Sequence, residues 1–522
     1  MMGTVAGAGL IIALLTPPAE YLPEGEEPKT FAAMNPPPGY NLETMGEIAR
    51  QVEAHLLPHV GADPQAFLRG DTAVPPIRYI NLGYDPTRLR IISETEDPAH
   101  IEALMDALTA HYESYPGMRA FAAKGSIISS NDGGTRSISL DISGPDLAAI
   151  FDTARAIDRR ARELFDGPRI QSQPSSLTLA QPLVQIRPDW DRAAELGLST
   201  DAIGFSVAAL TQGAYVDDFF LGDDKIDIYV YGDEAAEPRL EQVPGLLLRS
   251  PGGATLPLSA VARIEELADT ISIRRVDGRR TVTLHIIPPD EVALETGVAQ
   301  VREALIGAMR ASGELPADIA IAISGASDAL ERTRAALSGN FLIVLAIVYL
   351  LLVAIFTHWA YPLLIMTTIP LGVAGGIVGL ALMNGVGALL PALELAPISQ
   401  PFDMITMLGF LILMGTVVNN PILIVDQARR NLEHEHMPPL QAVTAAIEAR
   451  LRPIAMTTLT TLCGIAPLVL IPGEGTELYR GVGAIVLFGL LGAAVVTLSF
   501  LPAMLVFVLK LARRFGLSKE SA

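Results

Sequence analysis

The chain of 522 residues carries 37 Lys and Arg against 57 Asp and Glu, a net charge of −20, and 50% of its residues are hydrophobic. This acidity argues against nucleic acid as a partner, because phosphate binding needs a basic face, and against tight attachment to anionic lipid headgroups. Residues 339–522 hold nine basic and nine acidic residues, so the excess acid lies in residues 1–338. The sequence therefore divides into an acidic, soluble-looking front and a neutral, apolar back.

The first predicted element is an apolar stub over residues 1–16, which is too short to cross a bilayer comfortably. It lacks the basic start of a signal peptide, and Pro17-Pro18 does not look like a small-residue cleavage site. We interpret the stub as the tail of a truncated transmembrane span.

Strands and amphipathic helices then alternate through the acidic front. Apolar residues recur with helical period over 41–57, behind an Asn41 cap, and again over 98–115, with a strand at 88–93 between them. The order repeats with a strand at 136–142, a helix over 147–164 and a strand that begins at Pro182. We expect two ferredoxin-like β-α-β subdomains, residues 17–135 and 136–338.

The second subdomain contains an insertion. Residues from about 213 to 276 have the pattern of β-hairpins with Pro and Gly between them, so this segment is predicted to be β-rich. A hairpin through Asp277-Gly278, a helix over 296–309 and a strand over 319–323 complete the subdomain before the chain becomes apolar.

Five apolar stretches in residues 339–522 predict transmembrane helices; they are 340–356, 361–382, 404–425, 453–471 and 481–511. Basic residues gather in the 427–452 loop and at the C-terminus, which predicts that both are cytoplasmic. Residues 17–338 and the loops 383–402 and 472–480 are then predicted to lie outside. The expected fold class is a polytopic α-helical membrane protein with a large extracytoplasmic α+β domain.

The third span has a polar middle. In "LILMGTVVNNPILIVDQARR", residues 411–430, Thr416, Asn419, Asn420 and Pro421 interrupt two apolar runs. Polar groups inside hydrocarbon cost free energy and usually face the interior of a helix bundle. They either serve a function or make structural interhelical hydrogen bonds, each worth roughly 1 kcal/mol or less.

Several stretches in order resemble the C-terminal half of a resistance–nodulation–division (RND) multidrug efflux transporter permease, of the acriflavine-resistance type. They are "PPAEYLPEGE" (17–26), "PPPGYNLE" (36–43), "AYVDDF" (214–219), "TTIPLGVAGG" (367–376) and "GTVVNNPILIVDQAR" followed by "EARLRPIAMTTLTTLCGIAPL". The resemblance implies a proton-driven exporter of amphiphilic compounds in the bacterial inner membrane, with residues 17–338 in the periplasm. It also implies a homotrimer, surrounded by membrane lipids, that works with a periplasmic adaptor and an outer-membrane channel. The insertion would then be a docking segment.

A complete member of this family has an N-terminal half with an adjacent Asp pair in its fourth span. No predicted span here contains such a pair, so we expect half of a transporter: a fragment, a split subunit or a start assigned too late. The resemblance places Asn419, Asn420, Arg450 and Thr457 at proton-relay or coupling positions. Asn419 stands where the best-known multidrug members have Lys, and an amide can hydrogen-bond a carboxyl group but cannot titrate.

Candidate substrate contacts are few. The segment that matches the family's Phe-rich loop, residues 60–85, offers Phe67, Tyr79 and Tyr84. His55 and His59 have no third ligand nearby, so no metal site is expected. We expect no cofactor and no catalytic residue, and the single cysteine, Cys463, excludes an intrachain disulfide. Export of a lipid-like or metal substrate, or a non-transporting periplasmic remnant anchored in the membrane, remain alternatives.

Overall fold

The computed structural model describes residues 2–23, 28–125, 134–211, 213–232, 240–270, 272–390, 398–471 and 476–514. The chain forms two compact units, residues 1–177 with 274–522, and residues 178–273. Parts of the segments that carry the topology prediction, residues 391–397, 472–475 and 515–522, lie outside the described residues, and that topology stays a prediction.

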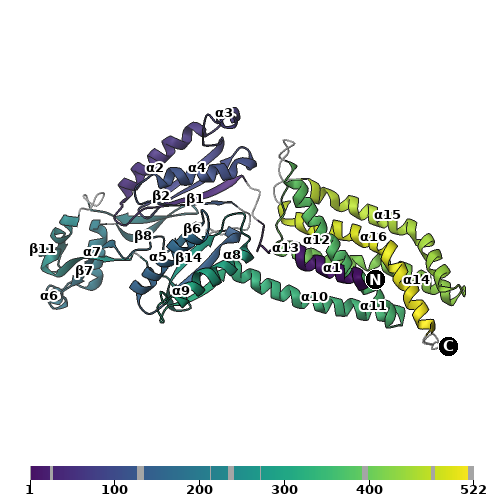
Figure 1. Cartoon of the computed structure of the whole chain (residues 1–522). Helices are drawn as coiled ribbons and strands as arrows, with labels where there is room; N and C mark the ends of the chain where they lie inside the picture. The colour runs from purple at the N-terminus through teal and green to yellow at the C-terminus, as the bar shows by residue number, and fades with distance from the viewer. Residues whose placement is uncertain are drawn as a thin grey trace. The chain divides into compact units, whose positions relative to one another are not determined.

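The first unit begins its folded domain with a four-stranded antiparallel sheet in the order β2-β3-β1-β4. Its strands are β1 (Lys29–Asn35), β2 (Ile77–Asp85), β3 (Arg88–Thr95) and β4 (Arg119–Lys124). Helices α2 (Leu42–Leu56) and α4 (Ile101–Glu113) lie on one face of this sheet (Figure 1). The predicted cap is confirmed, since the Asn41 side chain accepts a hydrogen bond from the Thr44 N–H at 2.8 Å. This part of the first unit also contains three short helices, η1 (Leu57–His59), α3 (Pro64–Leu68) and η2 (Pro98–His100).

A second sheet repeats this connectivity. Its strands β5 (Ile138–Ser143), β6 (Arg169–Gln173), β14 (Arg279–Ile287) and β15 (Ala320–Gly325) lie in the order β15-β5-β14-β6, and β13 (Arg275–Val276) pairs with the start of β14. The helices are α5 (Leu147–Leu164) and a continuous run of α8 (Leu294–Gln300), the π-helix η6 (Val301–Gly307) and α9 (Ala308–Ala311). A short 3₁₀ turn, η3 (Gly134–Arg136), precedes β5. In both sheets the first strand lies between the third and the fourth, in a β-α-β-β-α-β element order.

The strand predicted to begin at Pro182 forms, but in another sheet. This strand, β7 (Gln181–Pro188), pairs with β12 (Ala262–Asp269) in the second unit. Its place in the second sheet is taken by β6, a strand that was not predicted. The reason is that β6 buries the polar residues Gln171 and Ser172, so it has no hydrophobic pattern to detect. The second unit consequently begins at Thr178, well before the predicted start near residue 213.

The second unit contains two-stranded sheets and short helices around a small apolar core. Beside β7 and β12 it has α6 (Trp190–Glu195), α7 (Thr200–Thr211), β8 (Ala214–Leu221), β9 (Asp224–Val230), η4 (Leu240–Gly245), β10 (Leu247–Arg249), β11 (Thr255–Pro257) and η5 (Leu258–Ala260). The predicted β-hairpin over residues 214–230 is confirmed as β8 and β9, paired antiparallel. The predicted turn at Asp277-Gly278, in the first unit, is also confirmed, because both residues have positive φ.

All five predicted spans are present as helices long and apolar enough to cross a bilayer. They are α10 (Ala326–Phe356), α11 (Ala360–Met366) with α12 (Thr368–Gly387), α13 (Met404–Val417) with α14 (Asn419–Glu433), α15 (Pro439–Leu470) and α16 (Glu477–Arg514). The N-terminal stub is a shorter apolar helix, α1 (Met2–Leu15).

Glycines bring α12 and α16 into close contact. A Cβ atom added at Gly375 would lie 3.2 Å from the Cα of Gly492, and one added at Gly376 would lie 3.0 Å from the Ile485 carbonyl oxygen. Small residues of this kind let helix backbones approach within a membrane, where dispersion and packing hold helices together. The pair α12 and α16 therefore forms the tightly packed centre of the described spans.

Candidate functional site

The polar middle of the third span lies at a break between two helices. Pro421 has no backbone N–H and cannot bond the Val417 carbonyl, so α13 ends at Val417 and α14 begins at Asn419. The helical ladder resumes at Ile422, whose N–H bonds the Val418 carbonyl at 3.1 Å. Pro421 thus places the two amides, Asn419 and Asn420, at the break between α13 and α14.

The two amides have different surroundings. The Asn420 Nδ2 donates to the Thr458 hydroxyl of α15 at 3.3 Å, which is an interhelical hydrogen bond. Asn419 is exposed, as are Gly415 and Thr416 one turn before it. Asn420 therefore ties α14 to α15, whereas Asn419 points to a surface that no described residue covers.

Helix α15 adds a stripe of threonines to this surface. Thr457, Thr460 and Thr461 are exposed, and each hydroxyl donates to a carbonyl of its own helix one turn earlier. Because the hydroxyl protons are used within the helix, the outward oxygen lone pairs can only accept hydrogen bonds. We call Thr416, Asn419, Thr457, Thr460 and Thr461 the polar face.

Arg450 lies apart from the polar face. Its Nη2 donates to the Gln427 Oε1 at 2.8 Å, and Gln427 in turn donates to Asn431, which bonds the Ala442 carbonyl. Seven to eight residues separate this level from the Asn420–Thr458 bond on each helix, which corresponds to about 11 Å. The structure therefore joins Arg450 to the connection between α14 and α15, not to the amides.

A buried acid lies directly before the same span, outside its first helical residue, Met404. Asp403 is fully buried and caps α13, with its Oδ1 accepting from the Thr406 N–H at 2.6 Å and its Oδ2 from the Gln400 Nε2 at 3.0 Å. Burial raises the pKa of Asp403 to about 6, although these hydrogen bonds favour its charged form. Asp403 was not predicted from the sequence, where its signal is one carboxylate directly before an apolar run.

A buried ion pair joins the segment that follows α1 to the turn η3, which precedes the second sheet. Arg136 and Glu20 approach to 3.4 Å, with their side chains 7% and 8% exposed. Arg136 also bonds Asp290 at 2.7 Å and the Val292 carbonyl at 2.8 Å, while Glu20 accepts from the Leu294 N–H. The segment after α1 is thereby fixed to the start of α8.

The three predicted substrate contacts do not share one surface. Tyr79 and Tyr84 lie on opposite faces of β2, because side chains alternate along a strand and these positions differ by an odd number. Tyr84 covers α2 at Gly46, where an added Cβ would lie 3.1 Å from its hydroxyl. Phe67 sits on α3 and packs edge-on against His100, with ring centroids 4.8 Å apart. Their assignment as substrate contacts stays a prediction, and the structure separates Tyr79 from the other two.

Tyr79 instead belongs to the outer face of the first sheet, away from α2 and α4. The strand registers place Phe31, Ile92 and Phe121 on this same face, and Phe31 and Tyr79 are 36% and 38% exposed. We call Phe31, Tyr79, Ile92 and Phe121 the outer sheet face. At its edge Arg119 of β4 bonds Asp158 at 2.9 Å and Ser172 at 3.3 Å, which joins the first sheet to the second.

Histidines do not form a metal site in the part of the chain that the structure describes, which holds no group of three His, Cys, Asp or Glu residues placed to bind an ion. The His55 ring stacks on His111, with centroids 3.8 Å apart. Burial lowers the pKa of His111 and of His59, so both rings favour their neutral form.

Comparison with known proteins gives two findings. A family model described as the AcrB/AcrD/AcrF family matches residues 1–509. A crystal structure of a heavy metal efflux pump is similar in fold, with a TM-score of 0.71 and 22% sequence identity; the alignment covers 98% of this chain and 49% of the pump. The chain thus spans about half the length of that solved structure.

Proposed function

Because the chain belongs to the AcrB/AcrD/AcrF family, we propose that it forms half of a proton-driven RND exporter in the bacterial inner membrane. It is an α-helical multi-pass membrane protein with a β-rich domain outside the spans. In the proposed transporter this domain lies in the periplasm, and both of its sheets have the ferredoxin-like connectivity. The chain has no catalytic role in this proposal and moves its substrate without changing it.

The observation that carries the proposal is the polar face. Helix α10 is as exposed as α15, but its exposed side chains are apolar and suit lipid; they include Leu342, Ile343, Ile347, Leu350, Leu351 and Ile355. The polar face instead presents an amide and hydroxyl oxygens at the level of the hydrocarbon, where lipid offers them no hydrogen bonds. Such a surface requires a protein partner, and the N-terminal half of a transporter fits this requirement.

The chemistry of the polar face suits a carboxyl partner. A protonated carboxyl group of the other half can donate to a Thr457 oxygen or to the Asn419 carbonyl oxygen, and an ionised one can accept from the Asn419 amide. Asn419 therefore accommodates both protonation states, whereas a Lys at this position would favour the ionised state. We assign Asn419 and Thr457 to the proton relay, Asn420 to helix packing beside it, and Arg450 to holding α14 against α15.

The outer sheet face supports the proposal that the transported substrates are amphiphilic organic compounds. Aromatic and aliphatic side chains on a rigid sheet, with the polar groups Arg119 and Glu94 nearby in the strand registers, resemble the mainly apolar lining of small-molecule sites. We place substrate contact at Phe31 and Tyr79. Phe67 and Tyr84 pack within the first subdomain instead.

The β8–β9 hairpin has a surface that fits the proposed assembly with other chains. It is isolated as a two-stranded sheet, and its exposed apolar side chains are Tyr215, Val216, Phe219, Phe220, Leu221, Ile226, Ile228, Tyr229 and Val230. Exposed apolar patches of this kind mark protein interfaces. We propose that the hairpin serves the homotrimer, and that the second unit faces the periplasmic adaptor and outer-membrane channel.

The test reconstitutes this chain with an N-terminal half that carries an Asp pair, in vesicles with a controlled pH gradient. Asn419→Leu should abolish proton-coupled efflux without loss of insertion, because Leu suits the bilayer better than Asn. Thr457→Val should also impair transport, while Asn420→Leu, the neighbouring control, should have the milder effect. Wild-type rates for both Asn419→Leu and Thr457→Val at every pH would show that the polar face is structural.

A further inference from the structure

Four arginines crowd one short hairpin of the second sheet. The sequence "RRVDGRR" places Arg274, Arg275, Arg279 and Arg280 around the β13–β14 turn. Arg274 is paired, since its guanidinium lies 3.5 Å from the Asp141 carboxylate. The other three are exposed and make no ion pair with any residue in the described ranges. This is unexpected in a front half with a large excess of carboxylates.

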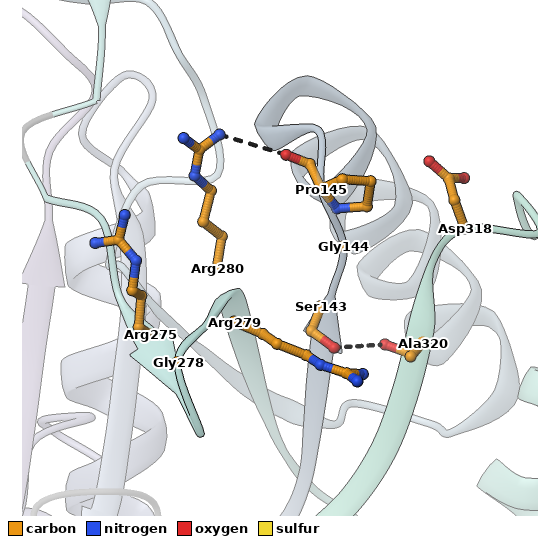
Figure 2. Close-up of a pocket in the computed structure, with 9 residues that line it drawn as sticks. All are labelled: Ser143, Gly144, Pro145, Arg275, Gly278, Arg279, Arg280, Asp318 and Ala320. Atoms are coloured by element: carbon orange, nitrogen blue, oxygen red, sulfur yellow. Dashed lines mark hydrogen bonds between the residues drawn. The ribbon is translucent and has the colours of Figure 1, made fainter.

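The strand register brings two of these positive charges together, which destabilises the hairpin. Arg275 and Arg280 are directly opposite each other in the antiparallel pair. Side chains of directly opposite residues project to the same side of a hairpin, and like charges in such positions destabilise it. Figure 2 shows both side chains extending in the same direction, with the Arg280 Nη1 donating to the Pro145 carbonyl at 3.3 Å. That hydrogen bond orients Arg280 but leaves its charge uncompensated.

These arginines line a cleft of about 470 Å³. Arg279 directly precedes Arg280 in β14, so its side chain projects to the other side of the strand; Arg279 and Asp318 also line the cleft, and Figure 2 shows Arg279 extending in another direction than Arg275 and Arg280. A volume of this size is in the range of small-molecule sites. A guanidinium offers several N–H donors in a planar fork that matches the oxygen atoms of carboxylate and phosphate groups.

We infer that this cleft binds a small oxyanionic ligand, a carboxylate or a phosphate, through Arg275 and Arg280. The anion relieves the repulsion between Arg275 and Arg280, which explains why this arrangement persists without a protein carboxylate between them. Asp318 sits on the same cleft and opposes the anion, so it limits affinity. This site is separate from the outer sheet face and from the polar face.

The experiment uses the full chain in nanodiscs of zwitterionic lipid, with inorganic phosphate and citrate as probes. Each probe is titrated against sodium chloride at equal ionic strength, and binding is measured by calorimetry. We expect saturable binding of at least one probe, and the preferred probe tells phosphate from carboxylate. Arg275→Gln with Arg280→Gln should weaken binding about tenfold or more, because charge-assisted hydrogen bonds are lost.

Two further variants fix the interpretation. Arg50→Gln with Arg310→Gln removes two exposed arginines elsewhere in the first unit and should leave affinity unchanged. Asp318→Asn keeps all the arginines and should tighten binding several-fold, so it tests the proposal even if the double arginine variant unfolds. Absence of saturable binding in the wild type, equal losses in the two double variants, or unchanged or weaker binding by Asp318→Asn would overturn the inference.

Discussion

The buried acid before the third span makes the stability of the membrane part depend on pH. Asp403 has a pKa of about 6 in the folded chain, against 3.8 for the unperturbed group. Because the folded-state value is the higher one, folding favours the protonated form. Asp403 therefore contributes its full stability below about pH 4, and that contribution is lost as the pH rises through about 6. A shift of roughly two units corresponds to about 3 kcal/mol.

Asp403→Asn removes this dependence while keeping the cap, since Asn caps helices as well as Asp does. The new amide would face the Gln400 Nε2, but Gln400 can flip, because its Oε1 is buried and has no hydrogen-bond partner among the described residues. We expect the variant and the wild type to have similar stability at pH 4. At pH 8 the variant should be the more stable by up to about 3 kcal/mol.

The assay is thermal unfolding followed by helical circular dichroism in detergent, from pH 4 to pH 8. We compare the free energy of unfolding of the variant with that of the wild type at each pH. The contributions of other titrating groups cancel in this difference. Asp146→Asn is the matched control, because Asp146 caps α5 in the same way but is exposed, so it measures the effect of replacing a capping Asp by Asn without burial. A difference for Asp403→Asn that does not change with pH would refute the reasoning.

Three other substitutions test the packing. Gly376→Leu should destabilise the spans by about 1–3 kcal/mol through overpacking against Ile485, whereas Gly385→Leu in the same helix, where an added Cβ meets nothing within 4 Å, should be tolerated in a detergent melting assay. Arg136→Met should lower the free energy of unfolding by about 3–5 kcal/mol, because it removes the arginine that pairs with the buried Glu20. Arg155→Met, which breaks the exposed pair with Asp152, should lower it by about 1 kcal/mol or less. Equal losses of stability in the two variants would contradict this. Arg119→Ala should speed hydrogen exchange in β4 and β6 by removing the bonds to Asp158 and Ser172, and unchanged exchange would show that other contacts join the two sheets.

Long elements with a clear period could be predicted from the sequence. The five spans and the helix behind Asn41 were found because apolar length and helical period do not depend on tertiary context. Strand β1 was missed because it is buried on both faces, apart from Phe31, and so shows no alternation. The outer sheet face was missed for another reason, since which residues share a face depends on how the strands pair.

The residue types of the candidate site could be predicted from the sequence, but their positions relative to the neighbouring helix could not. Two adjacent amides in hydrocarbon signal a polar function or a polar contact from residue type alone. Which amide is exposed, and that Arg450 bonds Gln427 instead of approaching Asn419, depends on how α14 slides along α15. Sequence spacing within one helix carries no information on that relation. Asp403 shows the same limit, because its burial comes from neighbours far along the chain.

Strand β15 runs into helix α10 with a single joint between them. Gly325 has φ +78°, and an added Cβ would lie 2.6 Å from the Ser139 hydroxyl oxygen, so only glycine fits there. The first turns of α10 are held to the second sheet's helices by Arg302–Glu331 at 2.8 Å and by Arg334–Glu295. Its 31 residues then extend for about 46 Å without a loop. Such a rod is a lever arm: a tilt of roughly 10° at the sheet displaces the Phe356 end by about 8 Å. Any tilt of the second sheet would therefore be carried along α10 to its far end, because β15 ends at Gly325 and α10 begins at Ala326.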